Sequence, residues 1–417
     1  MPERETNRPP SSFTPAETGV GHRGRRRGRL FVLGIVPGLL LAAYATAARL
    51  GPLPVPEGWP PESDLAEYSG VLHVHSMYSH DGRGTIEEIA QAAARAGVRV
   101  VFLTDHNTLA PLTDGKEGWY GSTLILVGAE ITTGSGYLLL LDPRPDLPVK
   151  ARGFALDDLV SRYRAAGAIV LLAHPDHPRL GWREEMPPID GIEVIDVFDQ
   201  VVAAPVHRQL LGLLAYPVNP TMAILSVVHW PRRVFERWDR LARERAAIGV
   251  LGLDAHGGIE LTEETGVRFP SHETAFRVGQ LHFVTREPLR RDEADRVRVY
   301  RALRTGQFYN AFDGFAPAAG FRFEVLGGEG VTLMGESVRL HEGLTLQVRV
   351  PPVGRAVVRL LHDGAVAHEG PAETTLRIPV EAPGVYRVEV DLEIPLVPIG
   401  TTRHMPWIFS NPIHVRP

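Results

Sequence analysis

The chain has 417 residues, of which 44% are hydrophobic and 22% charged, and it carries a formal net charge of -5. This composition is typical of folded globular domains and gives no electrostatic reason to expect nucleic-acid binding. Because the chain contains no cysteine, disulfides, thiolate metal sites and a cysteine nucleophile are excluded. Any metal must therefore be held by nitrogen and oxygen ligands.

The N-terminal 66 residues predict an anchor and a tether. Residues 1–29 form a polar tail that ends in the arginine-rich run HRGRRRGR, and an uncharged apolar run follows from Leu30 to Ala48. A run of this length roughly spans a bilayer core, and arginines before it stay on the cytoplasmic side. We therefore expect a transmembrane helix over residues 30–49 and an extracytoplasmic chain beyond it. A cleaved signal peptide, with a secreted product, is the alternative. The Pro-rich residues 50–66 predict an extended linker.

Residues 67–317 alternate short apolar runs with helical patterns, which indicates βαβ units around a parallel sheet or barrel. Strands are predicted in the runs VRVVFLTD, TLILVGAEI, YLLLL, AIVLLAHP, GIEVID and IGVLGLDAH. Helices are predicted over residues 85–97, 156–167 and 232–249, the first with a capping box formed by Thr85 and Glu88. The fold class of this region is therefore α/β.

Side chains that can bind metal appear where these apolar runs end. They are His75, Asp105, His106, Glu130, His174, Glu193, Asp254 and His256. Because the carboxyl ends of parallel strands open onto one face, we expect these groups to converge. Imidazole and carboxylate ligands suit Zn, Mn or Fe when no thiolate is present.

Each of these residues also has a purely structural interpretation. A single buried histidine beside a strand is more often a hydrogen-bonded core residue than a ligand, and Glu193 is equally well explained as a satisfied strand-end carboxylate. His80 is interpreted as a solvated turn residue. His207, His229 and His282 have no partner motif and are assigned structural roles.

Five motifs in order, HVHSMYSHDG, TDHN, VGAEIT, LAHP and GLDAHG, resemble the PHP (polymerase and histidinol phosphatase) superfamily over roughly Tyr68 to Phe315. Within it the chain looks most like stand-alone hydrolases related to carbaryl hydrolase, the CehA/McbA group. The resemblance implies a distorted (β/α)7 barrel that holds two or three divalent metal ions. It implies that His73 and His75 bind one metal with Glu130 and Asp254, that Glu130 bridges to a second metal bound by His174, and that Asp81, His106 and His256 bind a third.

One position departs from the family pattern. Members commonly carry a histidine after a glycine beyond the bridging glutamate, whereas this chain has Tyr137 there. The departure leaves the number of metals, two or three, open.

Such a site predicts a hydrolase. Clustered divalent metals activate water and offset charge on the attacked centre, which favours phosphoester hydrolysis with a bridging hydroxide as nucleophile. The resemblance implies that Asp254 is the catalytic base that orients this nucleophile. Carboxylic ester or carbamate hydrolysis is one alternative, and a metal-stabilised surface binding module without activity is another. The expected ligand is a small ester, and no nucleic-acid partner is expected.

The apolar stretch from Leu210 to Val228 has Pro217, Asn219 and Pro220 in its middle, so we interpret it as a barrel element or lid rather than a second membrane span. Beyond it, residues 318–417 contain short alternating runs separated by turns, one of them an Asp-Gly turn. They predict an immunoglobulin-like β-sandwich that packs on the barrel or contacts another protein.

Overall fold

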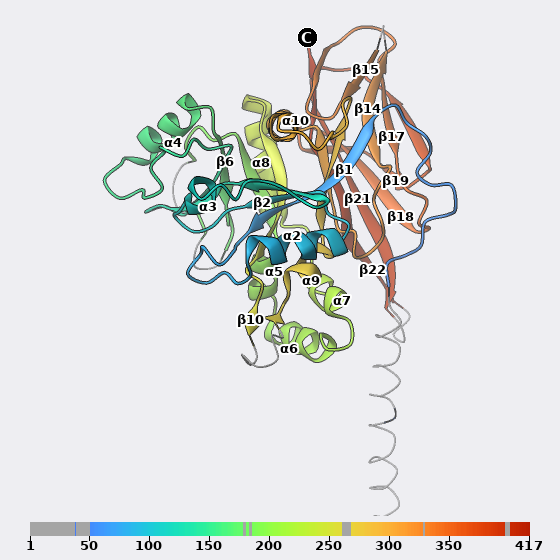
Figure 1. The fold of residues 1–417 in the computed structure, drawn as a ribbon. Coiled ribbons are helices and arrows are strands. Elements are labelled where there is room, and N and C mark those ends of the chain that lie inside the picture. The colour runs from blue at the N-terminus through green and yellow to red at the C-terminus, as the bar shows by residue number, and fades with distance from the viewer. Residues whose placement is uncertain are drawn as a thin grey trace, which may run out of the picture. The chain divides into compact units, whose positions relative to one another are not determined.

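The computed structural model describes Gly38 and residues 51–177, 181–182, 186–260, 268–327, 330–396 and 401–417 (Figure 1). The predicted cytoplasmic tail 1–29 and membrane segment 30–49 lie outside the described residues, apart from Gly38. Among the helices that are described, none has both the length and the apolar character to cross a bilayer.

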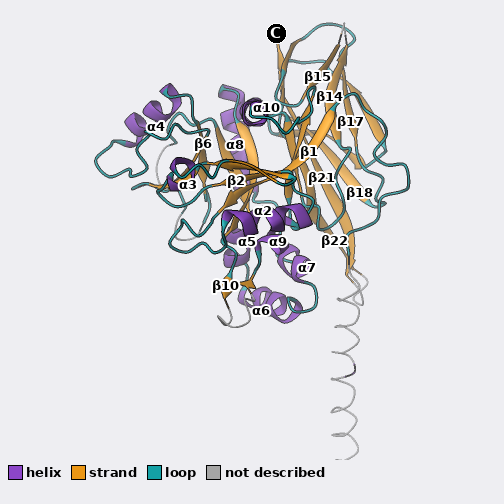
Figure 2. Cartoon of the chain, viewed as in Figure 1, coloured by secondary structure: helices purple, strands orange, loops and turns teal. Residues whose placement is uncertain are grey.

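The described helices are α2 Ile86–Arg95, α3 Ala110–Thr113, α4 Leu156–Ala165, α5 Val197–Ala203, α6 Val206–Ala215, α7 Pro220–Leu225, α8 Arg232–Glu244, α9 His272–Phe276 and α10 Ala294–Thr305. The strands up to the end of α10 are β1 Ala66–Val74, β2 Val100–Leu103, β3 Gly118–Tyr120, β4 Thr123–Val127, β5 Ala129–Thr132, β6 Tyr137–Leu141, β7 Ile169–Ala173, β8 Gly191–Asp196, β9 Ile248–Ala255, β10 Ile259–Glu260, β11 Arg268–Phe269 and β12 Gln280–Thr285. The remaining strands are β13 Phe308–Ala311, β14 Arg322–Gly327, β15 Gly330–Leu333, β16 Ser337–Arg339, β17 Thr345–Arg349, β18 Ala356–His362, β19 Ala365–Pro371, β20 Thr375–Pro379, β21 Gly384–Leu396, β22 Thr401–Ser410 and β23 Ile413–Arg416. Figure 2 shows that the part after α10 is built from strands and loops.

The strands around the predicted site form a closed circuit of pairings. Parallel pairs join β1 to β2 and β9, β2 to β4, and β8 to both β7 and β9. The chain runs from β4 into β5 through Gly128, and β5, β6 and β7 pair antiparallel. Strands β5 and β6 differ from the expected βαβ pattern, because the short connection between them cannot carry a crossover to a parallel strand. The α/β class is confirmed, whereas the count of seven β/α units remains a prediction.

Helix α2 shows how local sequence sets an element. Thr85 Oγ1 accepts a hydrogen bond from the Glu88 amide at 3.2 Å, and Glu88 Oε2 accepts one from the Thr85 amide at 2.9 Å, so the predicted capping box is present. The helix buries Ile86, Ile89 and alanines against the sheet. Gly97, with φ of 76°, takes the left-handed conformation beyond its end.

The predicted break in the apolar stretch 210–228 is also present. Helix α6 ends at Ala215 and α7 begins at Pro220, where Asn219 Oδ1 accepts a hydrogen bond from the Met222 amide at 3.1 Å. Proline at the first helical position suits a helix start and cannot continue a preceding helix. The stretch is therefore two short helices.

The C-terminal strands form two arrays. Strands β15, β14, β17 and β20 make an antiparallel four-stranded sheet. Strands β21 and β22 instead belong to the large sheet, since β22 pairs with β13 and β13 pairs with β12. The β18–β19 hairpin turns at Asp363 and Gly364, which both have positive φ, as the Asp-Gly pair predicts. The immunoglobulin-like topology itself remains a prediction.

Candidate metal centre

The structure brings together the eight residues that the sequence proposed as ligands. They come from β1, from the loops after β1, β2, β7 and β9, and from β5 and β9 themselves. These residues include two groups whose ligand-capable atoms all lie within 4.8 Å of one another. One group is buried and the other is more open to solvent. The buried group is His73, His75, Glu130 and Asp254, and the open group is His75, Asp81, His106 and His256. His75 belongs to both groups, so they form one continuous cluster.

The buried group is centred on two carboxylates. Asp254 Oδ1 lies 3.1 Å from His75 Nε2 and 3.4 Å from His73 Nε2. Glu130 Oε2 lies 3.4 Å from His73 Nε2, and Glu130 Oε1 lies 3.2 Å from His174 Nε2. Each oxygen of the Glu130 carboxylate thus lies near a histidine nitrogen, which is the arrangement that a ligand bridging two metal ions requires.

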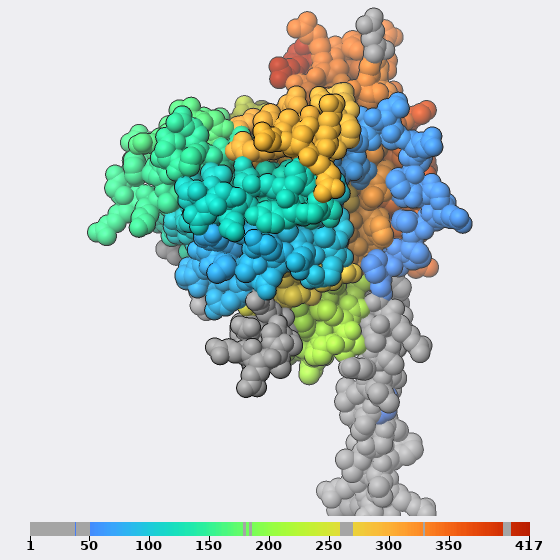
Figure 3. All heavy atoms as spheres, in the orientation of Figure 1, coloured from blue at the N-terminus to red at the C-terminus, as the bar shows by residue number. Residues whose placement is uncertain are grey.

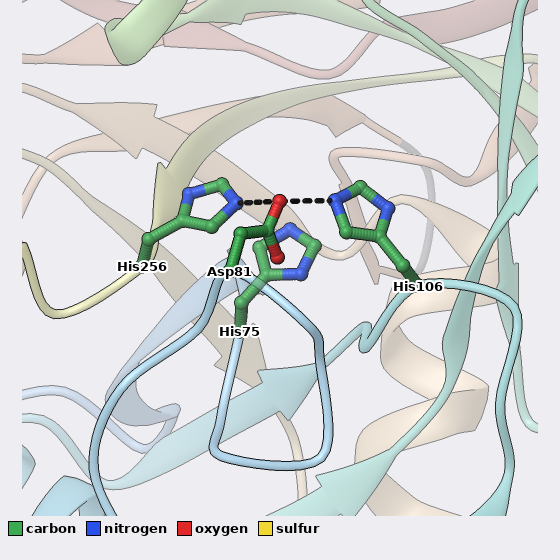
Figure 4. Close-up of side chains that lie close together, drawn as sticks. All are labelled: His75, Asp81, His106 and His256. Carbon is green, nitrogen blue, oxygen red and sulfur yellow. Dashed lines mark ion pairs between the residues drawn. The ribbon is translucent and has the colours of Figure 1, made fainter.

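The open group is centred on Asp81. Figure 4 shows its carboxylate between the rings of His256 and His106, with His75 below. Asp81 Oδ2 lies 3.2 Å from His106 Nε2 and 3.5 Å from His256 Nε2. The Asp81 side chain is 37% exposed, whereas His73 and Glu130 are fully buried. The cluster is therefore closed on the β-strand side and open to solvent at Asp81.

Several buried polar atoms of the cluster have no hydrogen-bond partner within the described part of the chain. They are Nε2 of His73, Nε2 of His75, both carboxylate oxygens of Glu130 and Oδ1 of Asp254. An unsatisfied buried polar atom is costly, and five around one point are rare unless something binds there. The donor set, imidazole nitrogen and carboxylate oxygen, fits a divalent transition metal.

A set of carboxylates behind the cluster orients its histidines. Glu193 Oε1 lies 2.7 Å from His73 Nδ1, and Glu193 Oε2 accepts a hydrogen bond from the His174 amide at 3.1 Å. Asp199 Oδ1 lies 3.0 Å from His174 Nδ1. When Nδ1 is held in this way, Nε2 of each ring is directed at the cluster.

The electrostatics of the cluster favour a cation. Burial alone would lower the pKa of His73, but Glu193, Asp254 and Glu130 hold it well above the usual value. Burial alone would also lower the pKa of His106, but Asp81 and Glu130 raise it to about 10. Burial would raise the pKa of Glu130, but the neighbouring histidines hold it well below its usual range. The carboxylates therefore attract positive charge, whether a proton or a metal ion supplies it.

Backbone strain marks three of the candidates. His73, His174 and Asp254 have φ values of 66°, 49° and 47°, in the left-handed region that non-glycine residues rarely adopt. The register of β1 against both β2 and β9 also shifts between Leu72 and Val74. Strain of about 1–3 kcal/mol per residue persists only where the surrounding structure enforces it, and such strain concentrates at functional sites.

Other residues named from the sequence lie in different settings. Asp105 accepts hydrogen bonds from the amide and hydroxyl of Ser76 at 2.7 and 2.8 Å, so it supports the loop after β1 and does not face the cluster. His80 is 79% exposed, in keeping with a solvated turn residue. Tyr137 meets the His174 ring edge-on at 5.7 Å between centroids.

The sequence analysis does not predict two residues that contact the histidines of the cluster, and it leaves the role of a third open. Asp199 and Ser79 were not named, although Ser79 Oγ accepts from the His106 amide and lies 3.1 Å from His75 Nδ1. For Glu193 the sequence allows both a metal-binding and a structural role. A glycine on the adjacent strand, Gly252 of β9, leaves space for the Glu193 carboxylate. No comparable pattern pointed to Asp199 in helix α5.

Comparisons with known proteins find a family model and one curated relative that match part of the chain. Residues 72–248 match the family model of the PHP domain, which supports the PHP superfamily for the region that holds all the candidates except Asp254 and His256. An uncharacterized protein of Methanocaldococcus jannaschii is 29% identical over 142 residues, which cover 30% of this chain and 81% of that protein.

Two solved structures show weaker likeness. A two-domain protein of Bacteroides vulgatus, said to contain a predicted PHP-like metal-dependent phosphoesterase, is 15% identical with a TM-score of 0.39, covering 86% of this chain and 99% of that chain. PsfC of Pseudomonas syringae is 13% identical with a TM-score of 0.31, covering 57% of this chain and 96% of that chain. TM-scores this low do not establish a shared fold over the whole chain.

Proposed function

We propose that the protein is a metal-dependent hydrolase that cleaves phosphate esters. The observation that supports this most strongly is the convergence of five unsatisfied buried atoms, on His73, His75, Glu130 and Asp254, at one end of the β-strand circuit. The opening to solvent at Asp81 favours an enzyme over a binding module, because structural metal sites are closed whereas catalytic ones keep an open position.

Two or three ions would share the eight ligands. His73, His75, Glu130 and Asp254 would hold the first, Glu130 and His174 the second, and Asp81, His106 and His256 the third. Such ions would supply Lewis acidity, which makes a water ligand nucleophilic near neutral pH and offsets charge on the ester. Zn, Mn and Fe all suit this donor set.

The chain's own residues would position the reactants. Asp254, at the end of β9, would orient the attacking water and accept its proton, since it is buried beside His73 of β1 and His75 just after it. Glu193 and Asp199 would keep the His73 and His174 rings in place. The ester would approach at the exposed Asp81 side, past His256 and His106.

A phosphate ester fits this arrangement because divalent ions held here would offset the negative charge on its non-bridging oxygens while Asp254 orients the attacking water. The resemblance of the motifs to the CehA/McbA group supports a carboxylic ester or carbamate as the competing substrate class. A panel of phosphomonoesters, phosphodiesters, carboxylic esters and carbamates separates the two.

The test is elemental analysis of the full chain expressed with Mn or Zn supplied, combined with that panel. We expect at least two ions per chain and turnover of a phosphate ester. Glu130→Gln should empty the site, whereas Glu287→Gln, at an exposed position, should leave the metal content unchanged. Wild-type protein without transition metal would contradict the proposal.

A further inference from the structure

Helix α6 exposes an apolar face to solvent. None of its residues is buried, and the exposed side chains are Val206, Leu210, Leu211, Leu213 and Leu214, at 56–75% exposure. Single exposed leucines are ordinary, but a contiguous apolar surface marks a site of interaction. Helix α5 continues this surface with Phe198 and Val202, which are 43% and 42% exposed. We refer to the exposed apolar residues of both helices as the α5–α6 surface.

The α5–α6 surface begins at the candidate metal centre. The ring of Phe198 lies 6.1 Å from the ring of His256, one of the proposed ligands on the open side. Met77, in the loop that carries Asp81, is 60% exposed. Phe198 therefore lies beside the open side of the cluster, and the Gln209 side chain of α6 donates hydrogen bonds to the Val201 and Val202 carbonyls of α5, which joins the two helices.

Charge along α6 and α7 is sparse and positive, whereas Asp199 of α5 is paired with His174 Nδ1 at 3.0 Å. From Gln200 to Val228 the only charged residue is Arg208. Arg403 joins it from β22 and donates a hydrogen bond to the Ser226 carbonyl at 3.0 Å, at the end of α7. An apolar surface bordered by arginines suits an anionic amphiphile and disfavours a cationic one.

The segment around Leu53 lies near helix α7. The Leu53 amide donates to the Phe315 carbonyl at 2.7 Å. The neighbouring Gly314 abuts α7, since a Cβ there would lie 2.7 Å from side-chain atoms of Thr221 and Leu225. Helices α6 and α7 pack on each other, and Figure 3 shows their light-green residues at the molecular surface. Residues around Leu53 therefore lie near α7, which packs on α6.

We infer that the α5–α6 surface rests on a lipid bilayer and that the site takes from it an ester with an anionic head and an alkyl tail. The tail lies along Phe198 and α6, while the head reaches the opening at Asp81. This inference rests on the proposed hydrolase function and adds the substrate class to it.

The experiment uses the full chain reconstituted in phosphatidylglycerol vesicles. The probes are the methyl and dodecyl forms of the best ester class in the panel. The double variant Leu210→Gln/Leu214→Gln should lower kcat/KM for the dodecyl ester on the order of tenfold or more, because two apolar side chains lose their contact with the tail and lipid. Its effect on the methyl ester should be much smaller. The matched control is Val297→Gln/Val366→Gln, at 59% and 53% exposed positions elsewhere, which should change neither rate.

Three results would overturn the inference. Equal losses for both esters, or none, would show that α6 does not contact the tail. A change in protomer number in the double variant, measured by light scattering in detergent, would show that a second copy covers the surface. Absence of both metal and hydrolysis in wild type would remove the proposed function and this inference with it, whereas the first two results leave the hydrolase intact.

Discussion

At the scale of single residues, the candidate site depends on side chains that are held in unusual backbone positions. His73, His174 and Asp254 all adopt left-handed φ values at strand ends, where the change in direction turns their side chains toward the shared cluster. Glu193 then contacts His73 Nδ1 at 2.7 Å, so the ring presents Nε2 to Glu130 and Asp254. The geometry of each ligand thus depends on a neighbour that is not itself a ligand.

The role of Asp254 can be separated from that of His256. Asp254→Asn keeps the shape but removes the proton acceptor, so kcat should fall on the order of 10²- to 10⁴-fold while much of the metal is retained. His256→Ala should act by loosening the ion near Asp81, and added Mn²⁺ should restore part of its activity. Kinetics and metal content are measured together on both variants. Full activity of Asp254→Asn with metal bound would identify another group as the base.

The contact by which Glu193 orients the His73 ring can be tested with a substitution at Gly252. A Cβ at Gly252 would lie 1.6 Å from Glu193 Oε1, so Gly252→Ala must displace that carboxylate. We expect metal affinity to fall by roughly 10- to 100-fold, and Glu193→Gln, which adds no volume, to show a similar loss. Gly330→Ala is the control, because nothing lies within 4 Å of its Cβ position. Titration calorimetry with Mn²⁺ gives the affinities, and unchanged values for both site variants would rule out the positioning role.

At the scale of elements, a buried polar network joins β1, β12 and β13 to the start of the C-terminal strands. Glu67 lies 3.2 Å from His282 Nδ1 and accepts hydrogen bonds from the Tyr309 hydroxyl and the Arg322 guanidinium, both at 2.6 Å. Asp313 holds the other nitrogen of His282 at 2.9 Å. His282, assigned a structural role from the sequence, is therefore the centre of this junction.

The network predicts how stability depends on pH. Burial alone would raise the pKa of Glu67, but His282 and Arg322 lower it from 4.5 to about 2, so its contribution is fully present above pH 4.5 and is lost as the pH falls toward 2. Burial alone would lower the pKa of His282, but Asp313 and Glu67 raise it from 6.5 to about 10, so its contribution is fully present below pH 6.5 and is lost as the pH rises toward 10.

The destabilisation caused by His282→Gln should accordingly be largest between about pH 4.5 and pH 6.5 and smaller on both sides. Urea unfolding across the pH range gives the free energy of unfolding of each protein. The exposed His341→Gln serves as control and should show no such maximum. A pH-independent difference for His282→Gln would contradict the assignment of charge to this network.

At the scale of the whole molecule, residues Leu50–Pro417 form one compact unit whose two halves share a sheet and a core. Asn411 Oδ1 accepts a hydrogen bond from the Gly249 amide, and Asn310 Oδ1 accepts one from the Leu251 amide, both at 2.8 Å. Gly249 and Leu251 lie on β9, which carries Asp254. The C-terminal strands therefore support the strand that supplies the proposed base.

A buried ion pair that joins the two halves gives a test of whether each half stabilises the other. Arg387 of β21 donates to both oxygens of Asp239 in α8, at 2.6 and 2.8 Å, and both side chains are buried. Asp239→Ala leaves a buried guanidinium without this partner and should reduce the free energy of unfolding by about 3–5 kcal/mol. Removing the exposed pair of Arg144 and Asp146 by Arg144→Ala should change it by less than about 1 kcal/mol.

Because the sheet is continuous, both halves should unfold in one transition, with coincident curves from tryptophan fluorescence and circular dichroism. Two separated transitions would show that the C-terminal strands fold as an independent domain.

Local chemistry in the sequence predicted helices α2, α4 and α8 and the apolar strands around the site, because caps, apolar periodicity and turn pairs act over a few residues. Thr85 and Glu88 start α2, the apolar stretch 210–228 is broken before Pro220, and Asp363 with Gly364 turns a hairpin, as expected. Strands β12 and β13 were not predicted, because their main partners, β1 and β22, are far away in the chain.

Only the tertiary structure decided what surrounds the predicted ligands. Glu193 meets His73 across 120 residues, and Asp239 meets Arg387 across 148 residues. No local pattern encodes such pairs, since their geometry depends on how β8 lies beside β9 and how β21 packs against α8. The exposure of the leucines on α6 was equally hidden, because helical periodicity indicates an apolar face but not whether another element covers it.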